Sequence, residues 1–507
     1  MQTFRRIAAV LIFPAIVWLV AACERETPTA APPRPLATVG GPTCNVPADY
    51  ATIQAAVNDP GCSTIDVAPG VYVETVTIPR TVTLNGAQAD VDARTRAVPL
   101  SSESVVGAPD GAFQIEGNNV VINGFTIEGV VSNPSVFPFT GLGAGIWTNP
   151  DFIGTLGGHQ ILNNIIQNNI VGIYLNNRCT FGTLVRFNLI RNNTAPGPAS
   201  GNAIYSDVGL CNALINQNKF SGNTSGSVLV IGPPVTTNTT ADISVTNNEL
   251  VGGTPESISF LGVSSSTIMG NVSIGSTSDG TINLFGNNSQ VMVTGNTLFN
   301  GVRAVVVSDP FLVGINTGIT ANQNCIQGNS IAGMEVDPLA YPTTPQLNAE
   351  NNWWGSTSGP KEFPRHTSGM GDNIIDPDQN VDFDPWLKSC PTGAAPRIVN
   401  GGGQINVTGG VGSFGFSAKQ ATQSGHLDYL NHFTGTHLNC TVNAVTILST
   451  TKAQLSGMCS SSTYTGSFMA EVEDNADPGK NADKFQITYS TVDGAVETIR
   501  SGNIQIH

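Results

Sequence analysis

The chain has 507 residues, of which 40% are hydrophobic and only 11% charged, and its formal net charge is −15 at pH 7. This length allows two or three domains with sizeable apolar cores. The acidic, lysine-poor composition argues against nucleic acid as a partner, because the phosphate backbone is bound mainly through Lys and Arg. It argues less strongly against acidic glycans, which a local basic cleft or a calcium ion could still hold.

The N-terminus predicts export. Two arginines precede the apolar run 7–20, which is short for a membrane span and is followed by small residues. The next residues, ending Ala21-Ala22-Cys23, resemble the lipobox of bacterial lipoproteins. This resemblance implies a signal peptide over residues 1–22 and lipidation of Cys23. Because Glu24 rather than Asp follows, it also implies a position at the outer membrane or cell surface. The alternative is ordinary secretion in which Cys23 has no special role.

A short motif recurs along most of the chain, consisting of an apolar cluster, an Asn and a second apolar run. Successive Asn positions are 23 to 30 residues apart. They are Asn164, Asn188, Asn218, Asn248, Asn271, Asn296, Asn324 and Asn352. A period of this size indicates one supersecondary unit per repeat, which can bury its apolar face only against its neighbours.

Within each period a second short run of β-branched residues follows the Asn, and none of these runs has a helical period. We therefore predict an all-β chain wound as a right-handed parallel β-helix of about ten rungs. Asn suits the corners because it tolerates the left-handed conformation. Its amide both donates and accepts, so Asn residues on successive rungs can form a ladder. The alternative is an antiparallel sandwich whose turns happen to contain Asn.

The one convincing helix covers residues 50–57, where Ile53, Ala56 and Val57 share one face. A solenoid needs a cap at each end, so we expect this helix to close the first rung. The segment 51–86, which contains the helix, a Pro-Gly-x-Tyr turn and the first strands, resembles the N-terminal opening of pectin-lyase-like β-helix proteins.

The other end of the predicted solenoid carries a second family motif. The segments Asn351–Gly355, Gly359-Pro360 and Asp384–Leu387 resemble the closing motif of bacterial right-handed β-helix repeat proteins, including those related to NosD. Members of this family are lyases, hydrolases, esterases, binding modules and adhesin-like rods. The resemblance therefore implies a fold rather than a reaction.

The rest of the chain divides into segments that differ in composition. Residues 23–42 are rich in Pro, Ala and Thr, which predicts a disordered tether, and the β-helix is expected over residues 43–390. A linker follows at 391–397. Residues 398–507 contain no Asn repeat but alternate apolar and polar residues between Gly, Ser and Asn turns. This texture predicts a small antiparallel β-sandwich or barrel.

Eight cysteines remain when Cys23 is set aside, an even number that suits an oxidising compartment. They fall into pairs that are local in sequence. These pairs are Cys44 with Cys62, Cys179 with Cys211, Cys325 with Cys390, and Cys440 with Cys459. The second pair is separated by about one rung, so it could join neighbouring coils. Eight cysteines allow 105 connectivities, so the pairing is a hypothesis.

Four side chains are candidate glycan contacts. Arg186 and Arg191 lie on one predicted rung of a body with few cations. Trp147 and Phe152 lie in the long segment 131–158 between rungs, and insertions on solenoids collect on one face. The alternative for both arginines is a solvated turn position. The lyase motif Arg-x-Pro-x-x-Arg and the paired aspartates of polygalacturonases are absent.

Metal sites are weakly indicated, and we expect no cofactor. The densest acidic cluster lies near the closing motif and consists of Asp372, Asp376, Asp378, Asp382 and Asp384. Oxygen ligands at this spacing could hold Ca²⁺, with Asp376, Asp378 and Asp382 as candidates, although the Asp-Gly spacing of a calcium loop is absent. Ordinary turn chemistry is the alternative.

Four of the six histidines lie in the C-terminal module, namely His426, His432, His437 and His507. Asp428 and His437 could meet across a hairpin as a surface metal pair or a proton relay. The alternative is that these residues are exposed polar positions of strands.

These features predict a monomeric, lipid-anchored bacterial β-helix protein that binds a glycan or another cell-surface component without catalysis. The alternative is a polysaccharide lyase or glycoside hydrolase with its site on one face of the rungs. A groove that holds a cation beside two or more carboxylates would favour the enzyme, whereas a flat face of Asn, Thr and Ser would favour the binder.

Overall fold

The computed structural model describes residues 42–96, 100–131, 143–149, 155–235, 238–391, 398–419, 424–449, 452–476, 478–489, 492–493 and 496–506. The predicted signal peptide and Cys23 lie outside these ranges, as do Phe152 and most of the linker. Among the described residues, no helix has the length and apolar character that crossing a membrane requires.

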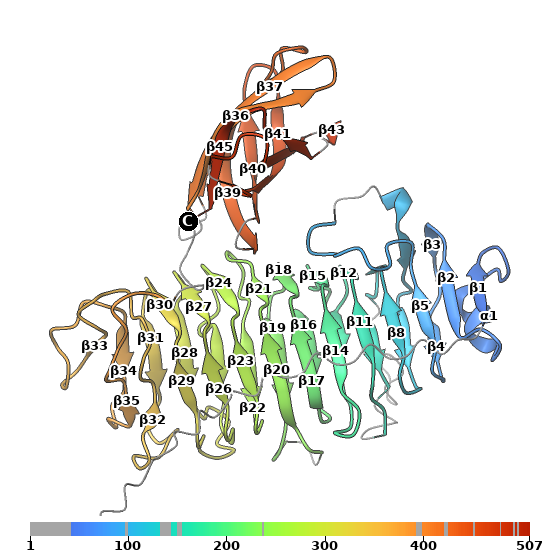
Figure 1. Ribbon diagram of the computed structural model, residues 1–507. Helices are drawn as coiled ribbons and strands as arrows, with labels where there is room; N and C mark the ends of the chain where they lie inside the picture. Colours follow the sequence, from blue (N-terminus) through green and yellow to red (C-terminus); the bar gives the residue numbers. More distant parts are fainter. Residues whose placement is uncertain are drawn as a thin grey trace, which may run out of the picture. The chain divides into compact units, whose positions relative to one another are not determined.

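The first 35 strands form three parallel sheets that run along one axis, so this part of the chain is a parallel β-helix (Figure 1). Sheet A contains, in spatial order, β1 (Thr43–Val46), β2 (Thr64–Val67), β5 (Thr83–Asn85), β8 (Val121–Asn123), β11 (Gln160–Leu162), β14 (Thr183–Arg186), β17 (Cys211–Asn216), β20 (Ala241–Thr246), β23 (Thr267–Met269), β26 (Met292–Thr294), β29 (Thr320–Asn322), β32 (Leu347–Asn348) and β35 (Val381–Asp382).

Sheet B contains β3 (Gly70–Tyr72), β6 (Ser104–Val106), β9 (Thr126–Glu128), β12 (Ile165–Gln167), β15 (Leu189–Arg191), β18 (Lys219–Ser221), β21 (Glu249–Leu250), β24 (Val272–Ile274), β27 (Thr297–Phe299) and β30 (Cys325–Gln327). Sheet C contains β4 (Val76–Ile78), β7 (Phe113–Ile115), β10 (Ala144–Thr148), β13 (Val171–Tyr174), β16 (Asn202–Ser206), β19 (Gly226–Ile231), β22 (Ile258–Leu261), β25 (Ile282–Leu284), β28 (Arg303–Val307), β31 (Ala332–Val336), β34 (Asn373–Ile375) and β33 (Lys361–Glu362).

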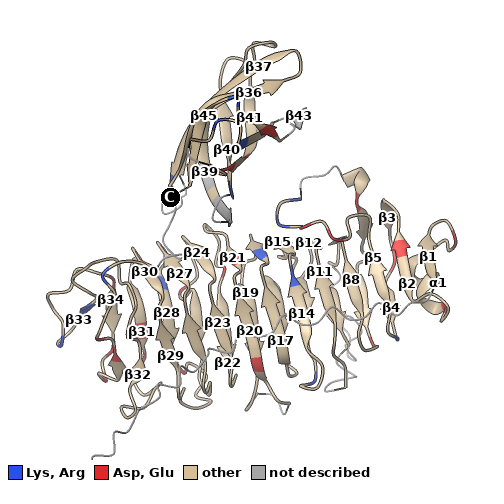
Figure 2. Ribbon diagram, viewed as in Figure 1, with Lys and Arg blue, Asp and Glu red and all other residues tan. Residues whose placement is uncertain are grey.

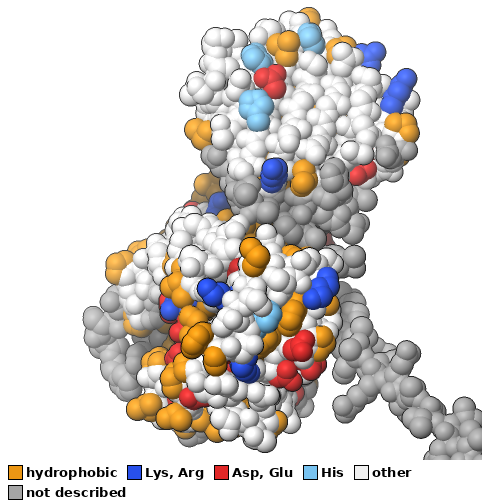
Figure 3. All heavy atoms as spheres, turned by 90° about the vertical axis from the view of Figure 1, so that its left-hand side faces the viewer, with side chains coloured by type: hydrophobic (Ala, Val, Ile, Leu, Met, Phe, Trp, Pro, Cys, Tyr) orange, Lys and Arg blue, Asp and Glu red, His pale blue; other side chains and the backbone are white. Residues whose placement is uncertain are grey.

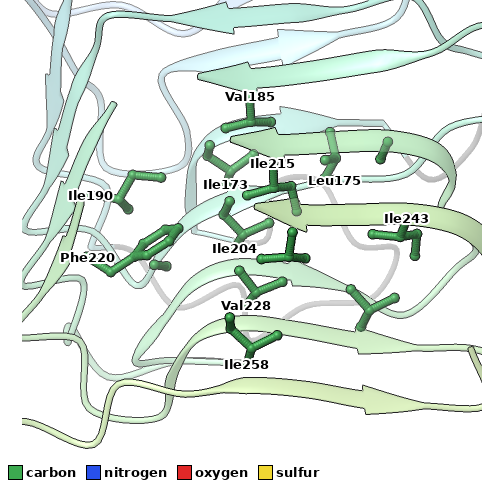
Figure 4. Close-up of a cluster of buried hydrophobic side chains, with 14 of the residues drawn as sticks. Ile173, Leu175, Val185, Ile190, Ile204, Ile215, Phe220, Val228, Ile243 and Ile258 are labelled. Carbon is green, nitrogen blue, oxygen red and sulfur yellow. The ribbon is translucent and has the colours of Figure 1, made fainter. Parts of the chain in front are cut away.

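The three sheets have 13, 10 and 12 strands, so the prediction of about ten rungs matches sheet B, and the other two sheets have more strands. Every second residue of a strand points inward and stacks on the equivalent residue of the next coil. Such stacks include Ile173, Ile204, Val228 and Ile258 in sheet C, and Val185 with Ile215 in sheet A (Figure 4). Burying one such side chain contributes roughly 1.5–3 kcal/mol.

The corner between sheets A and B is built on a ladder of buried asparagines. All eight repeat asparagines belong to it, and each Nδ2 donates to Oδ1 of the next at 2.9–3.2 Å. Each acceptor oxygen also receives the backbone N–H of the preceding ladder residue. The amides therefore satisfy the polar groups of the turn inside an otherwise apolar core.

The conformational part of the Asn argument needs a correction. The left-handed residue at this corner is the one before the ladder Asn, with φ of 54–58° at Asn163, Phe187 and Gln217. The ladder asparagines themselves do not have positive φ. The corner therefore requires Asn for the hydrogen bonds of its side-chain amide, and the residue before it adopts the strained left-handed conformation.

A second ladder that the repeat motif did not predict lies between sheets B and C. Asn169, Asn193 and Asn223 link in the same way, at 3.0–3.1 Å. The next position is Glu256, whose Oε1 accepts from the Asn223 amide at 3.1 Å and whose Oε2 lies 2.5 Å from Ser227 Oγ. Burial raises the pKa of Glu256 to about 7, although the three hydrogen bonds oppose this shift.

The first coil is capped by α1 (Ile53–Asn58), which is shorter than the predicted 50–57 at its start. Its buried residues are Ile53, Ala56 and Val57. Thr52 is the N-cap, accepting from the Ala55 N–H, and the Glu74 carboxylate accepts the N–H groups of the first turn. A short 3-10 turn, η1 (Leu100–Ser102), precedes β6. At the other end Trp354 is fully buried in the solenoid core.

The C-terminal part forms one curled antiparallel sheet of ten strands, sheet D. In chain order these are β36 (Ile398–Val407), β37 (Gly410–Lys419), β38 (Ser424–Asn431), β39 (His437–Ser449), β40 (Lys452–Ser460), β41 (Thr465–Glu473), β42 (Lys484–Tyr489), β43 (Val492–Asp493), β44 (Glu497–Thr498) and β45 (Ser501–Ile506). The last strand pairs with β36, and its neighbour β44 pairs with β42. The core contains a stacked pair, Phe414 and Phe485, with ring centroids 3.9 Å apart.

Four disulfides join Cys44–Cys62, Cys179–Cys211, Cys325–Cys390 and Cys440–Cys459. The first lies beside α1 in the opening coil. The second joins segments 32 residues apart on neighbouring coils, and the last joins opposed residues of β39 and β40.

A matched pair of asparagines on one coil tests the ladder. Asn324 lies in the ladder and is fully buried, whereas Asn322 lies two residues earlier on the outer face of β29. We expect Asn324→Ala to lower the free energy of unfolding by about 3 kcal/mol, because it leaves buried amide partners unsatisfied. Asn322→Ala should change it by less than about 0.5 kcal/mol. Urea unfolding followed by circular dichroism measures both, and equal losses would contradict the role of the ladder.

Glu256 predicts a pH-dependent stability. The pKa of Glu256 in the folded state lies above its unfolded value of 4.5. Between these two pKa values the folded state binds more protons than the unfolded state does. The free energy of unfolding therefore falls as pH rises from about 5 to 8. Glu256→Gln mimics the neutral acid and should match the wild type near pH 5. At pH 8 it should be more stable by up to about 3 kcal/mol.

The comparison between the two proteins isolates Glu256 from other titrating groups. The buried His159, whose pKa burial lowers to about 4, is common to both, so its contribution cancels. Urea unfolding at pH 5, 6.5 and 8 gives the difference, and a difference that does not vary with pH would refute the assignment.

Candidate functional site

Residues 86–96, which follow β5, cross the outer face of sheet B, and we call this segment the strap. Its Ala93 packs against Ile165 of β12 and Leu189 of β15, and the Ala93 N–H donates to the Phe187 carbonyl at 3.1 Å. The strap is therefore attached to coils that lie far along the chain from it.

A buried arginine anchors the end of the strap. Arg96 donates to the carbonyls of Asn163 and Phe125, at 2.7 and 3.1 Å, and its Nε lies 2.8 Å from the Glu103 carboxylate. The two side chains of this ion pair are 0% and 3% exposed. Such a pair fixes position more than it adds stability, because desolvation offsets most of its attraction.

Beside the strap, two arginines contact one phenylalanine. The guanidinium carbons of Arg94 and Arg186 lie 5.0 and 4.2 Å from the centroid of the Phe187 ring. Asp92 neutralises Arg94 at 2.6 Å, whereas Arg186 donates to the neutral Gln217 Oε1. Burial, and then the neighbouring Arg94 charge, lower the pKa of Arg186. Phe187 also has a left-handed φ of 58°, which costs a bulky residue on the order of 1–3 kcal/mol.

A row of planar polar side chains runs along the outer face of sheet B. Strand register places Glu128, Gln167 and Arg191 on successive coils. Arg191 Nε donates to Gln167 Oε1 at 2.8 Å, and Gln167 Nε2 donates to Glu128 Oε2 at 2.6 Å. Burial lowers the pKa of Arg191, and the Glu128 charge opposes this shift.

On the next coil Ser221 takes the place in register with Arg191, and an ion pair stands two residues to the side of the row, where Lys219 is in register with Leu189. Lys219 Nζ lies 3.2 Å from Glu249 Oε1, and these residues pair in register on β18 and β21. We call Glu128, Gln167, Arg191, Lys219 and Glu249 the polar patch. Figure 2 shows that charged positions are sparse over the solenoid strands and that basic positions occur near β14 and β15.

The surface of sheet B beyond the patch is apolar and covered. Ile274 and Phe299 are 6% and 3% exposed, and Cys390 packs against their cluster through its bond to Cys325. The polar patch thus begins beside the strap, on the same strands β12 and β15, and ends before the part of sheet B that the segment ending at Cys390 covers.

The structure separates the four predicted glycan contacts. Arg191 belongs to the polar patch, and Arg186, on the same coil, stands beside the strap on sheet A. Trp147 lies on β10 of sheet C, where it pairs with Tyr174 and is only 4% exposed. Its ring is therefore covered rather than available for stacking. Phe152 lies outside the described residues.

Sheet C carries a second group of charges. Arg303 of β28 forms ion pairs with both Asp279 and Glu335. Asp337 lies two residues beyond Glu335, and its pKa is raised by burial and then by the Glu335 charge. This arrangement places a cation beside two carboxylates, which is one part of the criterion stated above for an enzyme.

The aspartates near the closing motif have separate structural partners. Asp372 accepts from Gly328, Asn329 and the Asn329 amide, which ends a ladder. Asp376 pairs with Arg365 at 2.7 Å, and Asp378 accepts the Leu339 N–H. In the described part of the chain, no group of three or more His, Cys, Asp and Glu side chains could hold a metal ion.

The predicted contact between Asp428 and His437 in the C-terminal sheet is present. His437 Nε2 lies 2.9 Å from Asp428 Oδ2, on adjacent strands. The Nε2 atom of His432, in the turn that follows β38, lies 2.9 Å from Ser413 Oγ. Both pairs are on the outer face of sheet D.

Sequence reasoning missed the strap and most of the polar patch. The signal was present, because Gln167 and Arg191 each stand three residues after a ladder Asn. Residues at equal distances after the corner lie in register, so their side chains meet.

Neither the protein-family models nor the curated proteins include a match to this chain. Among solved structures, the chain is similar to the Dettilon tailspike protein, with 12% identity over 87% of this chain and 86% of that chain and a TM-score of 0.38. It is also similar to a tailspike protein of the Acinetobacter baumannii bacteriophage Fri1, a capsular polysaccharide depolymerase, with 10% identity over 87% and 78% and a TM-score of 0.35. A third similar structure is the catalytic domain of a GH87 alpha-1,3-glucanase in complex with nigerose, with 12% identity over 67% and 68% and a TM-score of 0.30.

Proposed function

We propose that this protein binds an extended glycan on the outer face of sheet B without cleaving it. The observation that carries the proposal is the polar patch, in which the carboxylate of Glu128, the amide of Gln167 and the guanidinium of Arg191 stand in register on three consecutive coils. Hydrogen bonds between neighbours hold Glu128, Gln167 and Arg191 in fixed orientations. Such preorganised groups bind hydroxyls with little loss of side-chain entropy.

The ligand is an extended chain because the patch runs along the solenoid axis, first as the row of three and then as the Lys219–Glu249 pair two residues to its side. Coils are separated by about 4.8 Å, so five coils from β9 to β21 present polar groups over roughly 20 Å. Arg191 uses only Nε in the row, which leaves its terminal N–H groups to donate to a ligand.

We further propose that the protein is exported and held at the bacterial outer membrane or cell surface. Four disulfides are typical of proteins that fold in an oxidising compartment. The lipobox-like sequence ending at Cys23 would supply a lipid anchor for a monomer, with residues 24–42 as the tether. Mass spectrometry of the mature N-terminus tests this part, and an unmodified cysteine would overturn it.

Replacement of Arg191 tests the glycan proposal. We expect Arg191→Gln to weaken binding about tenfold or more, because hydrogen bonds to a charged group contribute about 1.5–3 kcal/mol. Immobilised neutral and acidic polysaccharides identify the ligand, and calorimetry with oligosaccharides of that ligand measures the affinity.

Lys361→Gln is the matched control, because Lys361 is an exposed cation of the closing coils, far along the solenoid from the patch. It removes the same charge and should leave the affinity unchanged. Equal effects of the two variants, or no binding of the wild type to any polysaccharide, would overturn the proposal.

A second candidate function is glycan cleavage at Arg303. Glycoside hydrolysis needs one carboxylic acid with a raised pKa and a second, ionised carboxylate. The pKa of Asp337 is raised by burial, and Glu335, two residues before it, is held in place by Arg303.

An activity assay decides between the two functions. We expect no new reducing ends and no unsaturated products when the protein is incubated with neutral and uronic polysaccharides. Chromatography of the products over a day, at pH 5 and pH 7, checks this. Turnover that Glu335→Gln or Asp337→Asn abolishes would reverse the assignment and make the protein an enzyme.

A further inference from the structure

The residue Phe187 departs from the pattern of the corner at which the asparagine ladder lies. The residue before each of the eight ladder asparagines has a left-handed φ of 54–65°. At seven of these positions it is Asn, Gly or Gln, and only Phe187 is aromatic. A bulky side chain in this conformation costs on the order of 1–3 kcal/mol, and such strain is common at functional sites.

The Phe187 ring holds two guanidinium groups close together. The guanidinium carbons of Arg94, on the strap, and Arg186, on β14, lie 5.0 and 4.2 Å from the ring centroid. Burial, and then the Arg94 charge, lower the pKa of Arg186. Two cations at this separation repel each other, and a bound anion relieves the repulsion.

Carboxylates do not cancel the charge at the ring. Asp92 pairs with Arg94 at 2.6 Å, whereas Arg186 donates to the neutral Gln217. The next acidic residue of the strap, Asp90, is bound to Asn123 on β8, two coils before β14. The two arginines and Asp92 therefore leave one positive charge beside the ring.

Other arginines of the solenoid are paired with carboxylates. Figure 3 shows acidic and basic side chains together at the closing end of the solenoid. The pairs are Arg96 with Glu103, Arg303 with Asp279 and Glu335, and Arg365 with Glu362 and Asp376.

Both arginines at the ring keep donors for a ligand. Arg94 donates to Asp92 through Nε and Nη2, and Arg186 donates to Gln217 through the same two atoms. Among the described residues, Nη1 of neither arginine has a partner. The N–H groups of a guanidinium match the oxygens of a carboxylate or sulfate, and partners that already orient it reduce the entropy lost on binding.

We propose that Arg94 and Arg186, held apart by Phe187, bind an oxyanion carried by a glycan, either a uronate carboxylate or a sulfate ester. This inference rests on the proposed glycan binding and deepens it, because it assigns a charged group to the ligand. The formal charge of −15 repels polyanions in general. Retention by an acidic polymer therefore requires a local site of this kind.

Polymers that differ only in charge test the site. Native gels of the full-length protein contain polygalacturonate or its carboxyl-reduced form in one pair, and dextran sulfate or dextran in the other. We expect one acidic polymer to retard the protein more than its uncharged counterpart, and the pair that shows this difference identifies carboxylate or sulfate. Arg186→Gln should weaken the charge-dependent binding at least about tenfold, because hydrogen bonds between charged groups are the strong ones.

Arg178→Gln is the matched control. The Arg178 guanidinium carbon lies 4.3 Å from the centroid of Phe181, and among the described residues no second arginine shares that ring. The variant removes the same charge and the same kind of ring contact, so it should leave the difference within each pair of gels unchanged. Circular dichroism and the urea midpoint check the fold of both variants.

Phe187→Asn removes the ring without adding strain. It gives this corner the residue found at Asn163 and Asn247, where φ is 54°. We expect the urea midpoint to stay at or above that of the wild type, while the charge-dependent retardation falls. A lower midpoint with unchanged retardation would assign the ring to structure and overturn the proposal.

Arg191→Gln separates this site from the polar patch. If the polar patch alone is wrong, Arg191→Gln binds every polymer as the wild type does, and Arg186→Gln still removes the difference within a pair. If this site alone is wrong, Arg186→Gln behaves like Arg178→Gln. That result, or a wild type that never distinguishes an acidic polymer from its uncharged counterpart, overturns the proposal.

Discussion

The asparagine ladder is the interaction on which the rest of the solenoid depends. Parallel strands of three residues offer few backbone hydrogen bonds, and a slip of one residue would move every core side chain outward. The side-chain amide of each ladder residue donates to the ladder residue of the next coil and accepts from that of the coil before. These hydrogen bonds fix the position of the corner on every coil. Register then follows from the corner, and residues at equal distance from it lie in a row.

The fixed register explains why function can be built from single side chains on separate coils. Gln167 contacts Glu128 and Arg191 although 39 and 24 residues separate them along the sequence. A row of this kind needs no loop to hold it, because neighbouring strands already place the groups about 4.8 Å apart. The strained Phe187 and the buried Arg96 are the two exceptions, where the strap rather than the strand register fixes a side chain.

The fold was accessible from the sequence because its determinants are local and repeated. The Asn motif, the apolar runs, the apolar face of the capping helix and the four local cysteine pairs all lie within a few tens of residues. The second ladder was missed because it contains only three successive asparagines and Glu256 takes the fourth position. The strap was missed because Ala93 and Arg96 contact coils up to 96 residues away, and nothing in their local sequence encodes that contact.

Only part of the candidate site could be predicted from the sequence, for a related reason. Arg186 and Arg191 stand out as rare cations, but what makes them different from the neighbouring cations Arg94 and Lys219 is their partners. Gln217 and Gln167, both neutral, hold the two arginines, whereas Asp92 and Glu249 neutralise the cations next to them. In a chain with 36 acidic residues and 21 basic ones, a glutamine partner leaves the guanidinium charge in place while still orienting it. An arginine oriented in this way loses little entropy when a ligand oxygen arrives, so the choice of Gln over Glu is the feature that separates a binding surface from a structural ion pair.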